Sequence, residues 1–234
     1  MTDKDQESKP SKRDMMTDEQ RERIREKEVA WNNKVKEASD YKDAVGNKMD
    51  DGVIETVAAL NLLGFPTNQS CAGHPEKLIS PYIGITEPGY PEETYVGQKA
   101  VENEIAIKYG IGIGDLKGGK NYHTAAAKEA RSIYSKNEKT QEFMEWQNRL
   151  MVLWDKADRL IAEFNENREV EPKIKLRHKW GQISMTGNPE DDDPFDETPL
   201  TQEQRQELLP RIIAAQKEMR DFTEFLKKKF FETQ

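Results

Sequence analysis

Apolar residues recur at spacings of three and four along several stretches of the chain, which is the pattern of amphipathic helices. The clearest stretch is 139–166, where the apolar positions form a seam like that of a coiled coil. A second stripe lies within 200–234. The seam in 139–166 consists of Phe143, Trp146, Leu150, Leu153, Ala157, Leu160 and Phe164. The stripe in 200–234 consists of Ile212, Ala215, Met219, Phe222 and Leu226. Because both stripes need a partner, we expect the two helices to pack on each other as a long hairpin.

Two further helices are predicted in the first third of the chain. Thr17 and Gln20 have the spacing of a capping box, so a helix should begin there and run to about residue 41. Its apolar positions are sparse, which favours an appendage with a narrow contact stripe. The next helix begins at Asp50 and Asp51 and ends at Gly64. Its apolar face consists of Val53, Ile54, Val57, Ala58 and Leu60.

Short segments rich in β-branched and aromatic residues predict strands near 66–72, 80–86 and 174–186. The last of these is long enough to be a hairpin. Together the patterns predict an α+β fold that is predominantly helical, with a small sheet, surrounding helices and the long helical hairpin.

The same patterns divide the chain into five parts. Residues 1–16 are expected to be a disordered tail, and 17–41 an N-terminal helical appendage. An α+β core domain should span 42–186. An acidic linker at 187–199 then leads to 200–234, the C-terminal helix that should pack on the 139–166 helix.

Composition changes the picture in two ways. Apolar residues make up 35% of the chain and charged residues 34%, against about 45–50% and about 25% in typical globular proteins. The core should therefore be lean and the helices well solvated. The formal charge of −8 argues against nucleic acid as a partner, because neutralising phosphates needs an excess of Lys and Arg.

The single cysteine, Cys71, excludes an intramolecular disulfide and favours a reducing compartment. The apolar runs are shorter than the roughly 20 residues that a membrane helix needs, and residues 1–14 lack the apolar core of a signal peptide. We therefore expect a cytoplasmic protein with no membrane partner.

The strongest chemical feature is the segment 67–74, Thr-Asn-Gln-Ser-Cys-Ala-Gly-His. His74 can keep Cys71 as a thiolate, which is the combination that nucleophilic catalysis needs. Thr67 and Ser70 can bind ligand or backbone oxygens, and Gly73 permits a positive φ and close approach of a ligand. We predict Cys71 and His74 as catalytic residues, with Thr67, Ser70 and Gly73 as ligand-binding residues.

Two alternatives stay open for this segment. Cys71 can be a small buried hydrophobe and His74 a loop cap, with no function beyond structure. Both can also bind a metal, but the remaining soft donors are only His123 and His178, and structural zinc sites usually contain several cysteines. We therefore predict no metal site, and the sequence identifies no cofactor.

Two other segments have recognisable patterns. Residues 114–121 match G-x-x-x-x-G-K, but Asn121 replaces the Ser or Thr of a nucleotide-binding loop, so we expect a flexible surface loop or lid. A basic run at 173–179 is predicted to be a strand with Lys175 and Arg177 on one face. These two residues can bind the anionic part of a ligand, or simply protect an edge strand.

The order Asp50, Val53, Leu60-Asn61, Thr67, Ser70-Cys71-Ala72-Gly73 resembles the Ser-Cys-Gly segment of the wybutosine-synthesis methyltransferases that act on tRNA. That family continues with Arg, whereas this chain has His74. The segment is also similar to Ser-Cys-x-Gly-His stretches of uncharacterised bacterial proteins. The resemblance implies a similar helix–strand–loop unit with a ligand-facing loop.

Three functions follow as hypotheses. The first is a binder of a small or phosphate-bearing ligand, such as a nucleotide, or an enzyme, with its pocket at residues 67–74. The second is a helical interaction protein that forms homodimers through its seams. The third is an RNA-associated protein, suggested by the resemblance and the basic run and opposed by the net charge.

Overall fold

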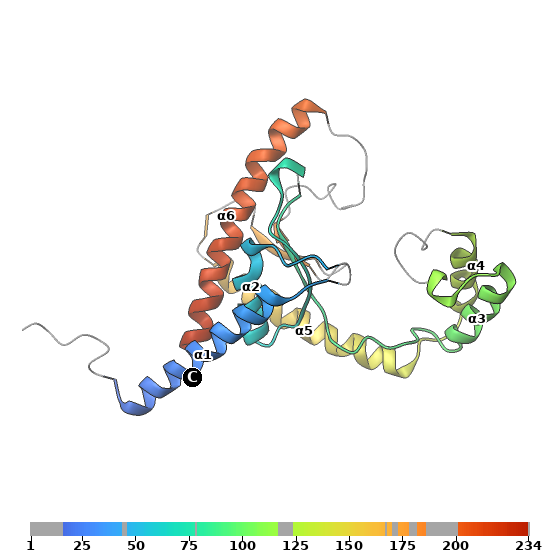
Figure 1. Cartoon of the computed structure of the whole chain (residues 1–234), viewed down its shortest axis with the longest axis horizontal. Helices are drawn as coiled ribbons and strands as arrows, with labels where there is room; N and C mark the ends of the chain where they lie inside the picture. The colour runs from blue at the N-terminus through green and yellow to red at the C-terminus, as the bar shows by residue number, and fades with distance from the viewer. Residues whose placement is uncertain are drawn as a thin grey trace, which may run out of the picture. The chain divides into compact units, whose positions relative to one another are not determined.

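The computed structural model describes residues 16–43, 46–77, 79–116, 124–166, 168–169, 173–177, 182–185 and 201–233 (Figure 1). Most of the predicted tail, the whole acidic linker and residues 117–121 of the glycine-rich segment lie outside these ranges. So do His123, His178 and Lys179.

The predominantly helical α+β fold is confirmed. The helices are α1 (Asp18–Asp40), α2 (Ile54–Leu62), α3 (Gln98–Tyr109), α4 (Ala125–Tyr134), α5 (Gln141–Asn165) and α6 (Gln202–Glu232). The strands are β1 (Thr67–Cys71), β2 (Tyr82–Ile85), β3 (Ile174–Arg177) and β4 (Gln182–Met185). Three short 3-10 turns are η1 (Asp51–Val53), η2 (Pro75–Lys77) and η3 (Ile113–Leu116). Within the described ranges, none of the helices has the length and apolar character required to cross a bilayer.

The chain forms two compact units. Unit 1 combines Met1–Ile85 with Leu160–Gln234, and unit 2 is Thr86–Arg159. The predicted core domain, 42–186, has different boundaries. Periodicity along the chain detects helices and strands, but it carries no information about which distant segments contact one another.

Helix α2 lies at the centre of unit 1. It packs against α1 on one side and α6 on another, and it also contacts β1 (Figure 1). The predicted apolar face is buried, and so are Thr56 and Ala59 outside that face. The Thr56 hydroxyl is 2.7 Å from that of Thr223 on α6, which satisfies both polar groups inside the core.

Helix α1 is part of this core and not an appendage to it. Its predicted capping box at Thr17 and Gln20 is present. Trp31 is buried and lies 6.2 and 6.0 Å, between ring centroids, from Phe230 and Phe231 of α6. The stripe on α1 is narrow, as predicted, but it buries Trp31 and Ala38, and Lys27 also donates a hydrogen bond to the Phe230 carbonyl of α6.

The stripe predicted on the last helix is confirmed, because all five of its members are buried on α6. Phe164, near the end of α5, packs on this stripe with its ring centroid 5.0 Å from Phe222 and 5.4 Å from Phe225. On α5 the buried position near the end of the seam is Ile161, and Leu160 is only partly buried. A regular α-helix has about 3.6 residues per turn, whereas a heptad repeat assumes about 3.5, so the buried stripe gradually departs from heptad positions.

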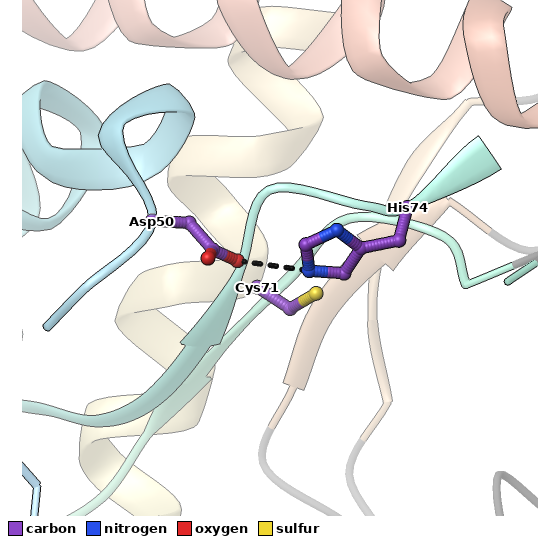
Figure 2. Close-up of side chains that lie close together, drawn as sticks. All are labelled: Asp50, Cys71 and His74. Atoms are coloured by element: carbon purple, nitrogen blue, oxygen red, sulfur yellow. Dashed lines mark ion pairs between the residues drawn. The ribbon is translucent and has the colours of Figure 1, made fainter. Parts of the chain in front are cut away.

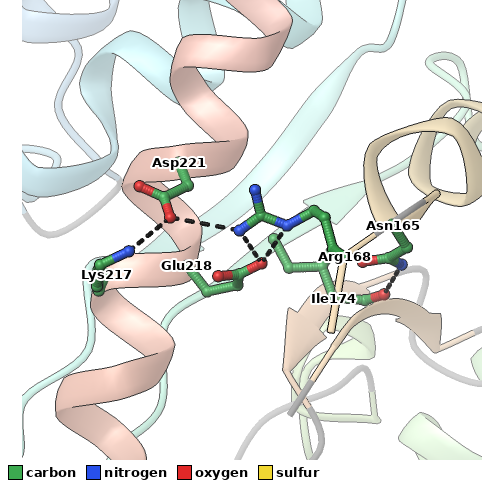
Figure 3. A network of polar contacts seen from close by, with 6 residues as sticks. All are labelled: Asn165, Arg168, Ile174, Lys217, Glu218 and Asp221. Carbon is green, nitrogen blue, oxygen red and sulfur yellow. Dashed lines mark hydrogen bonds and ion pairs between the residues drawn. The ribbon is translucent and has the colours of Figure 1, made fainter. Parts of the chain in front are cut away.

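Arg168, just after α5, is joined to α6 by a network of charged side chains (Figure 3). The guanidinium donates two hydrogen bonds, of 3.1 and 2.6 Å, to one carboxylate oxygen of the buried Glu218. It also lies 3.3 Å from Asp221 and 4.3 Å from the ring centroid of Phe164. Lys217 and then Arg168 hold the pKa of Asp221 below its ordinary value, although partial burial acts in the opposite direction.

The sheet has the order β1-β2-β4-β3, and all of its neighbouring strands are antiparallel. The 174–186 segment therefore contains two paired strands, as the hairpin alternative predicted. A β-bulge interrupts β1 between Thr67 and Gln69. Strands β1 and β3 are the two edges of the sheet as described.

Unit 2 has a small core of its own. Helix α3, η3 and α4 surround a buried cluster of Ile105, Ala106, Leu116, Ala126, Ala127 and Ala130. The start of α5 adds an aromatic group, in which the ring of Trp146 is 4.8 Å from Tyr90 and its indole nitrogen donates to the Glu87 carbonyl.

Candidate functional site

The site is built on the loop that leaves β1. Cys71 ends the strand, and the backbone then turns at Gly73, which has a φ of +81°. His74 exchanges two backbone hydrogen bonds with Ile79, of 2.8 and 3.1 Å. From α6, Gln216 donates its side-chain amide to the carbonyls of Ala72 and Gly73. The loop is therefore held by the backbone of Ile79 and by the side chain of Gln216 on α6.

Gly73 has the positive φ that its sequence context predicts, but the neighbouring space is filled by protein. A Cβ at this position would lie 2.9 Å from the Pro81 ring and 3.1 Å from the Ile79 carbonyl oxygen. The close approach that needs glycine is that of the chain to itself. Gly73 shapes the loop, and a ligand has no access to the position of its missing side chain.

Three potential donor atoms meet at this loop, one each from Asp50, Cys71 and His74 (Figure 2). All three lie within 4.8 Å of one another. The Asp50 carboxylate is 3.3 Å from Nε2 of His74 and accepts a 3.0 Å hydrogen bond from the backbone N–H of Ala72. Figure 2 shows the sulfur of Cys71 on the same side of the imidazole as Asp50.

The surroundings of the cluster are only partly wet. Cys71 is buried, with 8% of its surface exposed, whereas the side chains of His74 and Asp50 are 33% and 35% exposed. The backbone N–H of Gly73 lies 3.4 Å from the sulfur and donates to it. On its other side, the imidazole has Nδ1 3.5 Å from the carboxylate of Glu76.

The pKa of Tyr82 is affected by the same cluster. It is the strand partner of Cys71, so the two side chains leave the sheet on one face. Burial raises the pKa of the Tyr82 phenol, and the charges of Cys71 and Asp50 raise it further.

The structure brings together Cys71 and His74, the two residues predicted to be catalytic. Sequence reasoning missed Asp50, which it treated as the start of a helix. Asp50 precedes η1 and makes no cap hydrogen bond with its own helix. Its side chain turns instead to the loop after β1, so only the tertiary structure reveals its place in the site.

Thr67 and Ser70 line a different feature, a groove with a volume of about 660 Å³. We call it the β1 groove. It is bounded by the end of α1, by residues 41, 43 and 47–49, and by α2, β1 and Tyr82. Its lining residues are Lys34, Glu37, Ala38, Tyr41, Asp43, Asn47, Lys48, Met49, Val57, Asn61, Thr67, Asn68, Gln69, Ser70 and Tyr82. Cys71 and His74 are not part of this lining.

The sheet order separates Lys175 and Arg177 from the other predicted site residues. They lie on β3, at the opposite edge of the sheet from β1. Three strand spacings correspond to roughly 14 Å. The structure therefore does not bring them to Cys71 or to the β1 groove, because alternation within one strand says nothing about the order of strands in the sheet.

Two kinds of chemistry are open to the cluster. A thiol beside an imidazole can act as a nucleophile, with a carboxylate to orient the ring. Alternatively, sulfur, nitrogen and oxygen donors that converge can bind a metal ion. Comparisons with protein-family models, with curated proteins and with solved structures find no match to this chain.

Proposed function

We propose that this protein binds a small polar ligand of nucleotide size in the β1 groove. The observation that carries this proposal is that Thr67 and Ser70, predicted from the sequence to bind a ligand, line a groove of about 660 Å³. Binding sites for small molecules typically have volumes of about 300–1,000 Å³. The groove borders the Asp50–Cys71–His74 cluster through Tyr82, so a bound ligand would lie next to reactive groups.

The side chains of the groove suit a nucleotide. Lys48 supplies positive charge for a phosphate, whereas Lys34 is paired with Glu37 at 2.6 Å. Tyr41 is 57% exposed, which leaves a ring face for a base to stack on. Asn68 carries an amide that can both donate and accept hydrogen bonds, whereas the nitrogen of Asn61 already donates to the Val57 carbonyl and the Thr67 hydroxyl.

The strand itself adds to this supply of polar groups. As an edge strand, β1 has one side without a neighbouring strand in the described sheet. The bulge next to Thr67 alters the regular alternation there, and such bulges often occur beside functional sites, where they redirect side chains.

Titration calorimetry with AMP, GMP and adenosine tests the proposal. We expect at least one nucleotide to bind, and the Lys48→Ala variant to bind it about 10- to 100-fold more weakly. The reason is that a charge-assisted hydrogen bond contributes about 1.5–3 kcal/mol. Adenosine has no phosphate, so its affinity should be the same for the parent chain and the variant.

Lys42→Ala is the matched control. Lys42 and Lys48 face each other in an isolated β-bridge and both are exposed, but only Lys48 lines the groove. Equal losses for the two variants would mean that a general surface charge attracts the nucleotide. That result, or no binding of either nucleotide, would overturn the proposal.

A further inference from the structure

We infer that Asp50, Cys71 and His74 form a binding site for a single divalent metal ion of the zinc class. This inference does not rest on the ligand proposed for the β1 groove, since metal binding can be measured without that ligand. It replaces the sequence-based expectation that the chain has no metal site.

The spacing of the donor atoms fits a tetrahedral ion. Zinc binds nitrogen and oxygen donors at about 2.0–2.1 Å, so two such donors at a tetrahedral angle lie about 3.3 Å apart. Nε2 of His74 and the Asp50 carboxylate oxygen are 3.3 Å apart. With a zinc–sulfur distance of about 2.3 Å, the sulfur should be about 3.6 Å from the other two donors. All three donors lie within 4.8 Å of one another, so only a small side-chain adjustment is needed.

The carboxylate next to Nδ1, the second ring nitrogen of His74, also supports a metal site. Nδ1 of His74 lies 3.5 Å from the Glu76 carboxylate, which can accept its proton. A neutral ring with its proton on Nδ1 presents the lone pair of Nε2 to Asp50. In this form of the ring, the lone pair of Nε2 is available to a cation that Asp50 also binds. A carboxylate on the far nitrogen is also the common outer partner of histidines that bind zinc.

The arrangement fits a nucleophilic triad less well. In such a triad the nucleophile and the orienting carboxylate are at opposite nitrogens of the imidazole. One nitrogen takes the proton of the nucleophile, and the carboxylate holds the ring in position through the other. Here Glu76 is 3.5 Å from Nδ1, but Asp50 is 3.3 Å from Nε2, and Figure 2 shows the sulfur of Cys71 beside that same nitrogen, so Asp50 occupies the place at which the thiol would give up its proton. Donors that converge on one point are what a metal ion requires.

The donor types indicate the class of metal. A thiolate and an imidazole favour zinc and similar transition metals over magnesium or calcium, which prefer oxygen. Three protein donors leave a coordination position for water or a ligand, as in catalytic zinc sites. The partial exposure of His74 and Asp50 makes the cluster accessible from solvent. The N–H of Ala72 and the amide of Gln216 hold the oxygen donor and the loop in place.

Cobalt(II) is a suitable probe because its absorption reports both the ligand type and the geometry. The full chain, reduced and stripped of metal with a chelator, is titrated with cobalt(II) and then with zinc(II). We expect one cobalt per chain, a thiolate-to-cobalt charge-transfer band, and visible bands of tetrahedral intensity. Zinc should remove all of these signals.

Variants assign the site to the residues. Cys71→Ser should abolish the charge-transfer band, and His74→Ala and Asp50→Asn should each weaken binding by more than tenfold. Glu76→Gln should weaken binding by about 10–100-fold, as loss of an outer partner commonly does. Asp51→Asn is the matched control for Asp50→Asn, because Asp51 is the exposed next residue and is outside the cluster, and its affinity should not change.

Several results would overturn the inference. One is the absence of a charge-transfer band in the parent chain, which would mean that a proton and not a metal joins His74 to Asp50. Another is retention of full affinity in Cys71→Ser, which would place the metal elsewhere. Circular dichroism of each metal-free variant shows whether it is folded. The exposed position of Glu76 keeps the test valid even if a buried variant unfolds, and an unchanged affinity in Glu76→Gln would contradict the role of that carboxylate.

Discussion

At the scale of single residues, the site depends on a few positions whose neighbours are distant in sequence. Gly73 turns the chain between Cys71 and His74 at a φ of +81°, with Pro81 and Ile79 filling the space beside it. Gly73 therefore suits a turn in which a residue with a Cβ would be both strained and crowded.

Replacing this glycine should lower the stability of the fold for two separate reasons. In Gly73→Ala the new Cβ meets the Pro81 ring at 2.9 Å, in addition to the strain of the positive φ. We expect a loss of about 2–3 kcal/mol in the free energy of unfolding, measured by urea denaturation.

Gly64→Ala separates the two reasons. Gly64 has a φ of +84°, and a Cβ there has no atom within 4 Å, so only the backbone strain remains, about 1 kcal/mol. If both alanine variants lost the same stability, the contact with Pro81 would have no energetic role.

At the scale of elements, the fold is fastened by a small number of polar contacts between helices. The Arg168 network fixes the end of α5 to α6 through Glu218 and Asp221. Because α6 also holds the site loop through Gln216, the position of α6 matters to the cluster as well as to the core.

Asp221 makes this contact dependent on pH. Lys217 and Arg168 lower the pKa of its carboxyl in the folded chain, so folding is stabilised above the ordinary pKa of an aspartate. That stabilisation is lost as the pH falls through the lowered value. Asp221→Asn should lose about 0.5–1 kcal/mol at pH 7, and the difference from the parent chain should shrink towards zero in acid.

Denaturation by urea at a series of pH values provides the measurement. Glu232→Gln serves as the control, because Glu232 lies on the same helix in an exposed pair with Lys228, 3.8 Å away. Its effect should be smaller at every pH. A stability difference for Asp221→Asn that stays constant down to pH 2 would contradict the assignment.

At the scale of the whole molecule, unit 1 is assembled from the two ends of the chain. Met1–Ile85 and Leu160–Gln234 share one core, whereas unit 2 has the separate cluster of α3, η3 and α4. A substitution in the buried face of α6 should therefore destabilise helices near the other end of the sequence.

Phe222→Ala tests this organisation. Phe222 is fully buried, and truncation of a buried Phe commonly costs about 3–5 kcal/mol. In hydrogen-exchange measurements we expect faster exchange in α1 and α2, and little change in α3 and α4. Ile213→Ala, at a position 53% exposed on the same helix, should leave exchange in all four helices unchanged. Equal acceleration in both units would contradict the division.

The sequence by itself determined the local elements and the chemical types present. Helical periodicity identified α5 and the whole buried stripe of α6, because the residues of a stripe lie close together along the chain. The capping box fixed the start of α1 for the same reason. The 67–74 segment also contains Cys71 and His74, whose donor atoms lie within 4.8 Å of each other.

Only the tertiary structure decided which distant residues join them. It brought Asp50 to the loop after β1, placed Lys175 and Arg177 at the far edge of the sheet, and buried α2 between α1 and α6. The physical reason is that helix and strand periods reflect interactions between near neighbours. Strand order and the contacts of a loop depend on how hydrophobic faces find one another across the chain.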